Sequence, residues 1–97
     1  MPKYVSLISW TEQGIKTFRD TVNRANDAAR FAEKMGGKLE RILWTLGPYD
    51  VVTITEFPDD ETGTAFLLAL GSQGNVRTTT LRAFEPEEME RIISKAG

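Results

Sequence analysis

The sequence predicts an α+β domain with the element order β-α-β-β-α-β, followed by one further helix. Stretches rich in β-branched and aromatic residues alternate with stretches whose apolar residues recur every three or four positions. Gly36-Gly37 and Gly47-Pro48 separate neighbouring stretches of this kind. The 97 residues contain no repeat and no linker. We therefore expect one domain over residues 1–97.

The composition narrows the classes of function. The chain has 12 basic and 14 acidic residues, whereas nucleic acid and acidic membrane surfaces attract clustered Lys and Arg. We therefore expect neither as a partner. Cys and His are both absent, which removes the usual metal ligands, haem ligands and general base, and we expect no cofactor and no metal. The N-terminus shows no long apolar run, so we expect a cytoplasmic protein.

The first strand is predicted over residues 3–10. Strand alternation divides its side chains into one set with Tyr4, Ser6, Ile8 and Trp10 and another with Val5, Leu7 and Ser9. Both sets are largely apolar, which is typical of a strand that is covered on both sides.

A helical region follows from Thr11, its expected N-cap, to Met35. Its apolar stripe consists of Ile15, Phe18, Val22, Ala25, Ala29 and Ala32. The cap-type and β-branched residues at positions 20–23 favour a break, with Thr21 restarting the helix. Gly36-Gly37 ends it.

A central hairpin is predicted over residues 38–57, with its turn at Gly47-Pro48. A two-residue loop pairs Leu46 with Tyr49. The same register places Trp44 opposite Val51, Leu43 opposite Val52 and Ile42 opposite Thr53. A four-residue loop keeps this register, whereas a loop of odd length reverses the faces.

The last third of the chain adds a helix, a strand and another helix. Asp59 or Asp60 caps a helix that ends at Gly71, and residues 72–75 form a loop. Residues 76–84 form the fourth strand, in which either Thr78, Thr80 and Arg82 or Arg77, Thr79, Leu81 and Ala83 can face the helices. The last helix starts at Glu85-Pro86, and its apolar side carries Met89, Ile92, Ile93 and Ala96.

This order predicts a ferredoxin-like four-stranded antiparallel sheet with two helices on one face. If Val5, Leu7, Leu43, Val52 and Ile54 face the helices, the other face carries Tyr4, Ile8, Trp10, Ile42, Trp44, Val51 and Phe57. A soluble monomer rarely exposes so much apolar surface. We therefore expect self-association as a two-fold homodimer or a higher oligomer, with an aromatic-lined cavity between the two sheets. The last helix covers an edge or reaches the partner.

Four ordered motifs carry a resemblance to a known family. They are residues 4–15 with Thr11-Glu12-Gln13-Gly14-Ile15, the break Gly36-Gly37-Lys38, the stretch 44–52, and the stretch 71–84. Together they resemble the GYD-domain proteins, whose Gly, Tyr and Asp correspond here to Gly47, Tyr49 and Asp50. The resemblance covers nearly the whole chain and implies a ferredoxin-like dimeric α/β barrel. It supplies no mechanism, because the family is largely uncharacterised.

Six residues are candidates for a ligand site in the expected cavity: Tyr4, Trp10, Trp44, Tyr49, Thr53 and Arg82. The indoles offer flat apolar area and an N–H donor, and Arg82 would bind a carboxylate or enolate through two hydrogen bonds. Simpler readings stand beside these. Trp10 and Trp44 can belong to the core of the dimer interface. Arg82 can be a solvated residue of an edge strand, and residues 47–50 can serve only to form the turn.

Two readings of function remain open. The first is a small-molecule-binding homodimer that takes an apolar or aromatic ligand in an apolar cavity with a few hydroxyls, among them those of Ser6 and Thr55. The alternative is a cofactor-independent monooxygenase or isomerase, by analogy of fold with other dimeric α/β barrels. In that reading Trp10, Trp44 and Tyr49 position the substrate, and Asn75 or Arg82 stabilises developing negative charge. A third class, RNA binding through sheet aromatics, is opposed by the net charge of −2.

Overall fold

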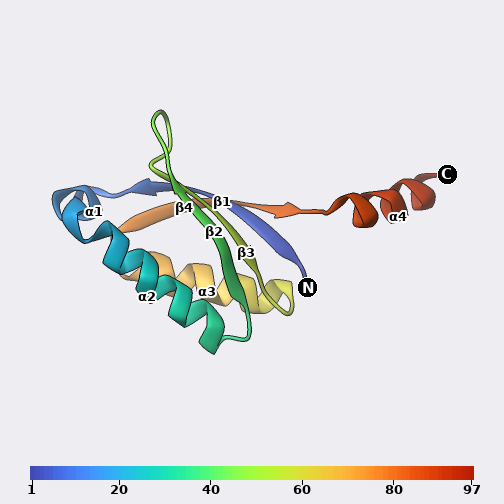
Figure 1. Ribbon diagram of the computed structural model, residues 1–97, viewed down its shortest axis with the longest axis horizontal. Coiled ribbons are helices and arrows are strands. Elements are labelled where there is room, and N and C mark those ends of the chain that lie inside the picture. The colour runs from blue at the N-terminus through green and yellow to red at the C-terminus, as the bar shows by residue number, and fades with distance from the viewer.

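The computed structural model describes residues 1–97 and confirms the predicted α+β order (Figure 1). The strands are β1 (Lys3–Trp10), β2 (Lys38–Trp44), β3 (Val51–Glu56) and β4 (Val76–Ala83). The helices are α1 (Glu12–Lys16), a 3-10 turn η1 (Phe18–Asp20), α2 (Thr21–Lys34), α3 (Asp60–Ser72) and α4 (Pro86–Ala96). The strands form one antiparallel sheet in the order β2-β3-β1-β4.

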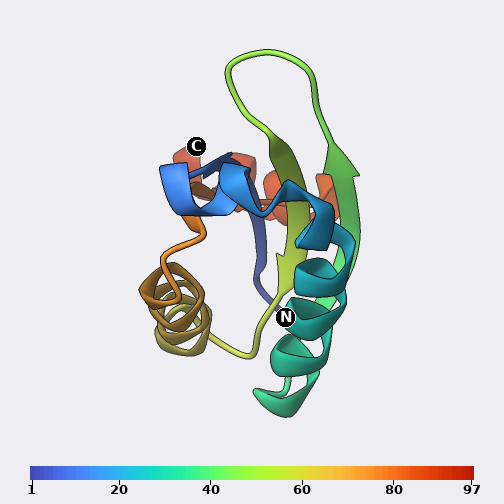
Figure 2. The same cartoon turned by 90° about the vertical axis from the view of Figure 1, so that its left-hand side faces the viewer.

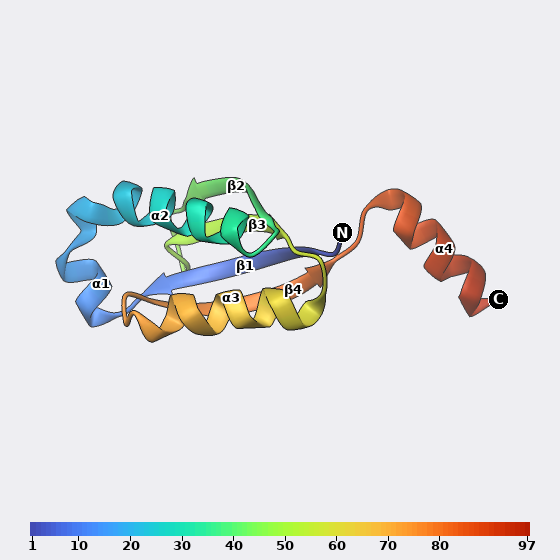
Figure 3. The ribbon, with the colours of Figure 1, turned by 90° about the horizontal axis from the view of Figure 1, so that it is seen from below.

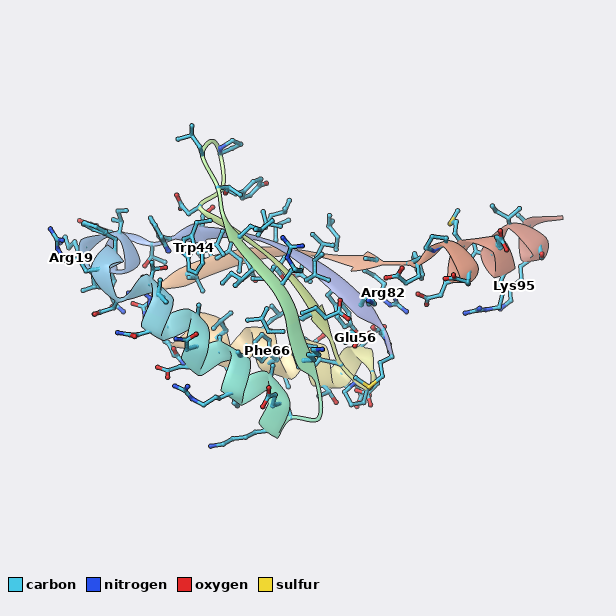
Figure 4. The ribbon with its side chains drawn as sticks, viewed as in Figure 1. Arg19, Trp44, Glu56, Phe66, Arg82 and Lys95 are labelled. Carbon is cyan, nitrogen blue, oxygen red and sulfur yellow. The ribbon has the colours of Figure 1, made fainter.

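The domain has two layers. Helices α2 and α3 lie along the same face of the sheet, and no element covers the opposite face (Figures 1 and 2). The core between the layers is aromatic: Tyr4 and Phe57 meet Phe66 of α3 and Ala32 of α2. The Phe57 and Phe66 ring centroids are 4.9 Å apart, and Phe57 is only 1% exposed. Figure 4 shows Phe66 in the space between α3 and the sheet.

The predicted break in the first helical region is confirmed. The Thr11 hydroxyl accepts a hydrogen bond from the Gly14 amide, α1 ends after one turn, and α2 begins at Thr21. The expected apolar stripe enters the core only in its second half, where Ala32 is fully buried. Phe18 and Val22 remain half exposed, because the break turns the first half of the stripe away from the sheet.

The register of the central hairpin is also confirmed. Trp44 lies opposite Val51, and Ile42 opposite Thr53. The strands end sooner than predicted, however, and residues 45–50 form a longer loop, so Leu46 and Tyr49 do not pair. Because this loop also has an even number of residues, the faces are the same as those of a two-residue loop.

The assignment of faces to the sheet is corrected. The side that packs under the helices carries Tyr4, Ser6, Ile8, Val51, Thr53 and Thr55, all buried. Residues paired directly across antiparallel strands share a face, so the set with Val5, Leu7, Leu43, Val52, Ile54 and Leu81 lies on the open side. The physical reason is that the large Tyr4 and Phe57 rings fill the space under the helices. Of the small hydroxyl groups beside them, that of Ser6 pairs with the Thr80 hydroxyl on the neighbouring strand.

Helix α4 projects away from the body along the direction of β4 (Figure 3). Glu85 and Glu88 form a capping box at its start, and Pro86 occupies its first turn. Ion pairs hold only this first turn: Lys3 to Glu85 at 3.0 Å and Arg82 to Glu88 at 3.9 Å. Its apolar side, Met89, Ile92 and Ile93, is therefore exposed to solvent. Neither α4 nor any other helix combines the length and apolar character needed to cross a bilayer.

Candidate functional site

The open face of the sheet is the first candidate site. Its centre is a contiguous aliphatic surface made by Val5, Leu7, Leu43, Val52, Ile54 and Leu81. Leu43 and Leu81, on the two edge strands, are 50% and 52% exposed. No helix or loop of the chain lies over this surface, as Figure 2 shows. We call these six residues the aliphatic patch.

An ionic row borders one end of the aliphatic patch. The Lys3 ammonium lies 2.9 Å from Glu40, 3.6 Å from Glu56 and 3.0 Å from Glu85. Hydrogen bonds that the Lys3 ammonium donates to Glu40 and Glu85 raise the pKa of Lys3. The Lys3 partner in turn holds the pKa of Glu40 below its ordinary value of 4.5. Lys38, which pairs with Glu56 across the strands, adds a second cation, so three carboxylates face two ammonium groups and this end of the face keeps a net negative charge.

The remainder of the open face carries two exposed cations. Arg41 of β2 pairs across the sheet with Ile54, and Arg77 of β4 pairs with Ser9, which places both on the open side. Arg77 lies at the end of β4 opposite the ionic row. The open face is therefore an aliphatic centre with an acidic end and two basic edge positions.

A cavity between the sheet and the helices is the second candidate site. It has a volume of about 80 Å³, and its floor includes the buried hydroxyls of Ser6, Thr53 and Thr55. Apolar side chains form the walls: Ile8, Leu39, Ile42, Val51, Phe66, Leu67 and Leu70. Arg24 and Gln73 line both this cavity and a second hollow between α2 and α3, and we take them as its rim.

Arg24 is the only ionisable residue in the lining of the cavity. Its guanidinium donates to the Thr17 carbonyl and hydroxyl, both at 2.9 Å, and to the Gly14 carbonyl at 3.2 Å. These bonds fix the first turn of α2 against α1. No Asp or Glu lines the cavity, so the lining offers no carboxylate that could act as a general base.

The structure brings two of the six predicted ligand residues together, since Trp10 and Thr53 both line the cavity. Trp44 lies outside it, 41% exposed, with its indole nitrogen donating to the Thr21 hydroxyl at 3.0 Å. Tyr49 lies in the hairpin loop. The expected chamber between two sheets cannot be lined by Tyr4, Trp10 and Thr53, because their side of the sheet packs against the helices.

Tyr4 and Arg82 belong to a polar cluster at the start of α3. The Tyr4 hydroxyl donates to Asp60 at 2.5 Å, and burial, together with this bond, raises the pKa of Tyr4 to about 12. Arg82 lies 5.8 Å from the centre of the Tyr4 ring and 3.8 Å from Asp60. Figure 4 shows Arg82 where β4 ends and α4 begins. Arg82 is thus neither a cavity residue nor a free surface cation.

Ser6 and Thr55 were expected among the hydroxyls of a cavity between two sheets, and they line this cavity on the other side of the sheet. Sequence reasoning missed Arg24 as a lining residue. No sequence pattern signals Arg24, since its place depends on how α1 turns into α2. No group of His, Cys, Asp and Glu side chains in the structure is arranged to hold a metal ion.

The turn around Gly47, Tyr49 and Asp50 fastens the hairpin loop to β1. The Asp50 carboxylate accepts from the Trp10 amide at 2.8 Å, and the Asp50 amide donates to the Ile8 carbonyl at 2.8 Å. The Thr45 hydroxyl donates to the Tyr49 carbonyl at 2.6 Å. Gly47 has φ of +125°, a conformation that favours glycine. These residues perform the turn chemistry that their types predict.

Comparisons with known proteins agree with this architecture. The family profile described as "GYD domain" matches residues 4–93. A protein of Thermus thermophilus named "Glutamine synthetase and cystathionine beta-lyase binding protein" is 32% identical over 84 residues, covering 86% of this chain and 88% of that protein. The crystal structure of TTHA0845, also from Thermus thermophilus, superimposes with a TM-score of 0.57 at 23% identity, covering 88% of this chain and 95% of that one. The last comparison shows a shared fold.

Proposed function

The chain belongs to the GYD-domain family, and from this premise we propose that it is a protein-binding module that acts as a homodimer. The observation that carries the proposal is the aliphatic patch, which no element of the chain covers. Monomeric soluble proteins rarely leave such a surface bare. A relative that covers most of this chain is named for binding two enzymes, which supports a role in binding proteins.

The second copy is the proposed occupant of the aliphatic patch. A two-fold interface brings the same surface of both protomers together. A flat sheet face can be complementary to a second copy of itself in this way. The charges support one arrangement in particular. When the two sheets lie with their strands reversed, the acidic end of one face meets Arg77 of the other.

The apolar side of α4 is the proposed contact for partner proteins. Met89, Ile92 and Ile93 are 46%, 37% and 58% exposed, and the helix that carries them stands clear of the body. An amphipathic helix of this kind binds by laying its apolar side in a groove of another protein. The candidate partners are the glutamine synthetase and the cystathionine beta-lyase of the same source organism, by analogy with the named relative.

The test combines mass measurement with partner binding. Sedimentation of the purified protein should give twice the mass of the 10.9 kDa chain. Each candidate enzyme is then immobilised, and binding of the wild-type protein is compared with that of Ile93→Glu and of Thr64→Glu, an exposed control on α3. We expect Ile93→Glu to lose binding and to remain a dimer. Binding of neither enzyme, or equal binding by both variants, would contradict this proposal.

Small-molecule binding is a second candidate function. The observation that favours it is the cavity between the sheet and the helices, with its apolar walls and hydroxyl floor. A concave, mostly apolar site with a few polar groups is the usual form of a small-molecule site. A ligand of the folded state should raise the unfolding midpoint, which a thermal-shift screen with aromatic metabolites would measure.

A further inference from the structure

We infer that the cavity under α2 and α3 binds a small, neutral and mostly apolar molecule that carries one hydroxyl or carbonyl group, such as a phenol. This inference rests on the second candidate function, small-molecule binding. It is independent of the homodimer and of the partner enzymes, which involve the opposite face of the sheet and α4. It adds the chemical class of the ligand and the residues that recognise it.

The recognition element is a row of hydroxyls across three neighbouring strands. Ser6 of β1 lies directly opposite Thr53 of β3 on one side and Thr80 of β4 on the other. The Ser6 and Thr80 hydroxyl oxygens are 2.9 Å apart. Ser6 and Thr53 are 2% and 7% exposed, in a layer where apolar residues are the rule.

The hydroxyl row retains capacity for a ligand. Each hydroxyl can donate one hydrogen bond and accept two, and the single bond between Ser6 and Thr80 uses a small part of that capacity. A valine at position 6 would fill the floor and add apolar burial. The small Ser6 side chain instead leaves open space beside polar atoms, which is what a bound hydroxyl or carbonyl group needs.

The charges of the lining favour a neutral ligand. No ionisable side chain reaches the hydroxyl floor, because Arg24 is the only one in the lining and lies at the rim. Three hydrogen bonds from the Arg24 guanidinium already go to Thr17 and Gly14. A carboxylate at the floor would lose its hydration without gaining a counter-ion, which costs more than burying a neutral hydroxyl group.

The size of the cavity favours a single ring. Its volume of about 80 Å³ is roughly half that of an engineered 150 Å³ cavity that holds benzene. Small movements of α2 and α3 would make up the difference, because the outer hollow shows that the two helices do not close together along their whole length. The rim at Arg24 and Gln73 provides the entry route.

Phenol is the probe for this site. The full-length, isotope-labelled protein is titrated with phenol, benzene and benzoate, and amide chemical shifts are followed by NMR. We expect saturable shifts centred on Ser6, Thr53 and Ala28, with the tightest binding for phenol. Benzene lacks the hydroxyl and should bind about tenfold more weakly, the usual worth of one hydrogen bond. Benzoate should not bind at the floor.

Two variants separate the cavity from its hydroxyls. Ala28→Leu fills the cavity from α2 and should abolish phenol binding, whereas Ala65→Leu, on the exposed side of α3, should leave it unchanged. Thr53→Val keeps the shape but removes a hydroxyl. It should weaken phenol binding about tenfold and leave benzene binding unchanged.

Three outcomes would overturn the inference. The wild-type protein shows no saturable phenol binding up to the solubility limit, Ala28→Leu binds phenol as the wild type does, or Thr53→Val does so. If Ala28→Leu does not fold, the shift map of the wild-type protein and the Thr53→Val comparison decide. Failure here leaves the sedimentation and enzyme-binding results unaffected, so it is distinguishable from failure of the protein-binding proposal.

Discussion

The covered face of the sheet mixes aromatic and hydroxyl side chains with aliphatic ones, whereas the centre of the open face is aliphatic throughout. On the covered face, Ser6, Thr53 and Thr55 are between 2% and 7% exposed. On the open face, Leu43 and Leu81 are half exposed. Three hydroxyl side chains are thus hidden from water, whereas two leucines face it.

This contrast shows that buried hydroxyl groups and exposed aliphatic groups are stabilised in different ways. A buried hydroxyl costs little when a neighbouring strand supplies its hydrogen bond, as the Ser6 and Thr80 pair does. An aliphatic side chain in water can form no such bond. Its free energy falls only when another surface covers it. The aliphatic patch is therefore the more informative surface for assembly, and the hydroxyl row the more informative one for a ligand.

The largest expected effect tests the covered face. Phe57→Ala should lower the free energy of unfolding by about 3–5 kcal/mol, the usual cost of removing a buried phenylalanine ring. Phe57 is 1% exposed and contacts both the Tyr4 and the Phe66 rings. Urea unfolding followed by circular dichroism measures the change. At concentrations where the protomers are separate, Leu43→Ala on the open face should cost below about 1 kcal/mol. Equal losses would contradict the difference between the faces.

The next effect tests the open face. Leu81→Glu places a charge in the aliphatic patch, on a residue that is 52% exposed within one protomer. We expect the dimer to weaken by at least about a hundredfold, or roughly 3 kcal/mol, while the protomer stays folded. Sedimentation across a range of concentrations gives the association constant. Thr64→Glu on α3 serves as the matched control, and an unchanged association constant for Leu81→Glu would count against the proposed interface.

A smaller effect concerns the polar part of the covered face. Tyr4→Phe removes the bond to Asp60 and should cost about 1 kcal/mol at neutral pH. Because folding raises the pKa of Tyr4 from 10.0 to about 12, its contribution is complete below pH 10 and is lost as the pH rises through 12. The difference between the wild type and Tyr4→Phe should therefore shrink over that interval. A constant difference up to pH 12 in chemical unfolding would contradict the role of this hydroxyl.

The smallest effect concerns the ionic row of the open face. Glu40→Gln removes the carboxylate whose pKa the Lys3 ammonium holds below 4.5. A lowered pKa stabilises the fold above pH 4.5, and this contribution is lost as the pH falls through the lowered value. The unfolding midpoint of the wild type should thus be higher than that of Glu40→Gln at neutral pH. In acid the two midpoints should become equal. Glu33→Gln, at an exposed position on α2, is the control, and a gap that persists in acid would argue against the ion pair.

Much of the fold could be predicted from the sequence, because local rules decide it. The Thr21 restart, the Trp44 and Val51 register and the Pro86 helix start all follow from residue types within a few positions. The faces of the sheet could not be predicted, because both sets of side chains along β1 are largely apolar. The choice depends on the volume under α2 and α3, which Tyr4 and Phe57 fill.

The candidate site was harder to predict for the same reason. Trp10 and Thr53 were predicted as site residues and line one cavity, but that cavity lies on the other side of the sheet from the one expected. The roles of Arg24 and Arg82 depend on tertiary contacts with Thr17, Asp60 and Glu88. Such contacts join side chains of different secondary-structure elements, so the pattern within a single helix or strand does not encode them.

The isolated position of α4 turns the C-terminal region into a built-in reporter of assembly. An 11-residue helix is marginal in water when nothing packs against it, and this one offers trypsin two cleavage points, Arg91 and Lys95. Digestion of an unaccompanied chain should therefore begin there and leave the sheet intact. Shielding of these peptide bonds by a bound protein would slow the first cut, so a simple gel time course could follow complex formation without any label.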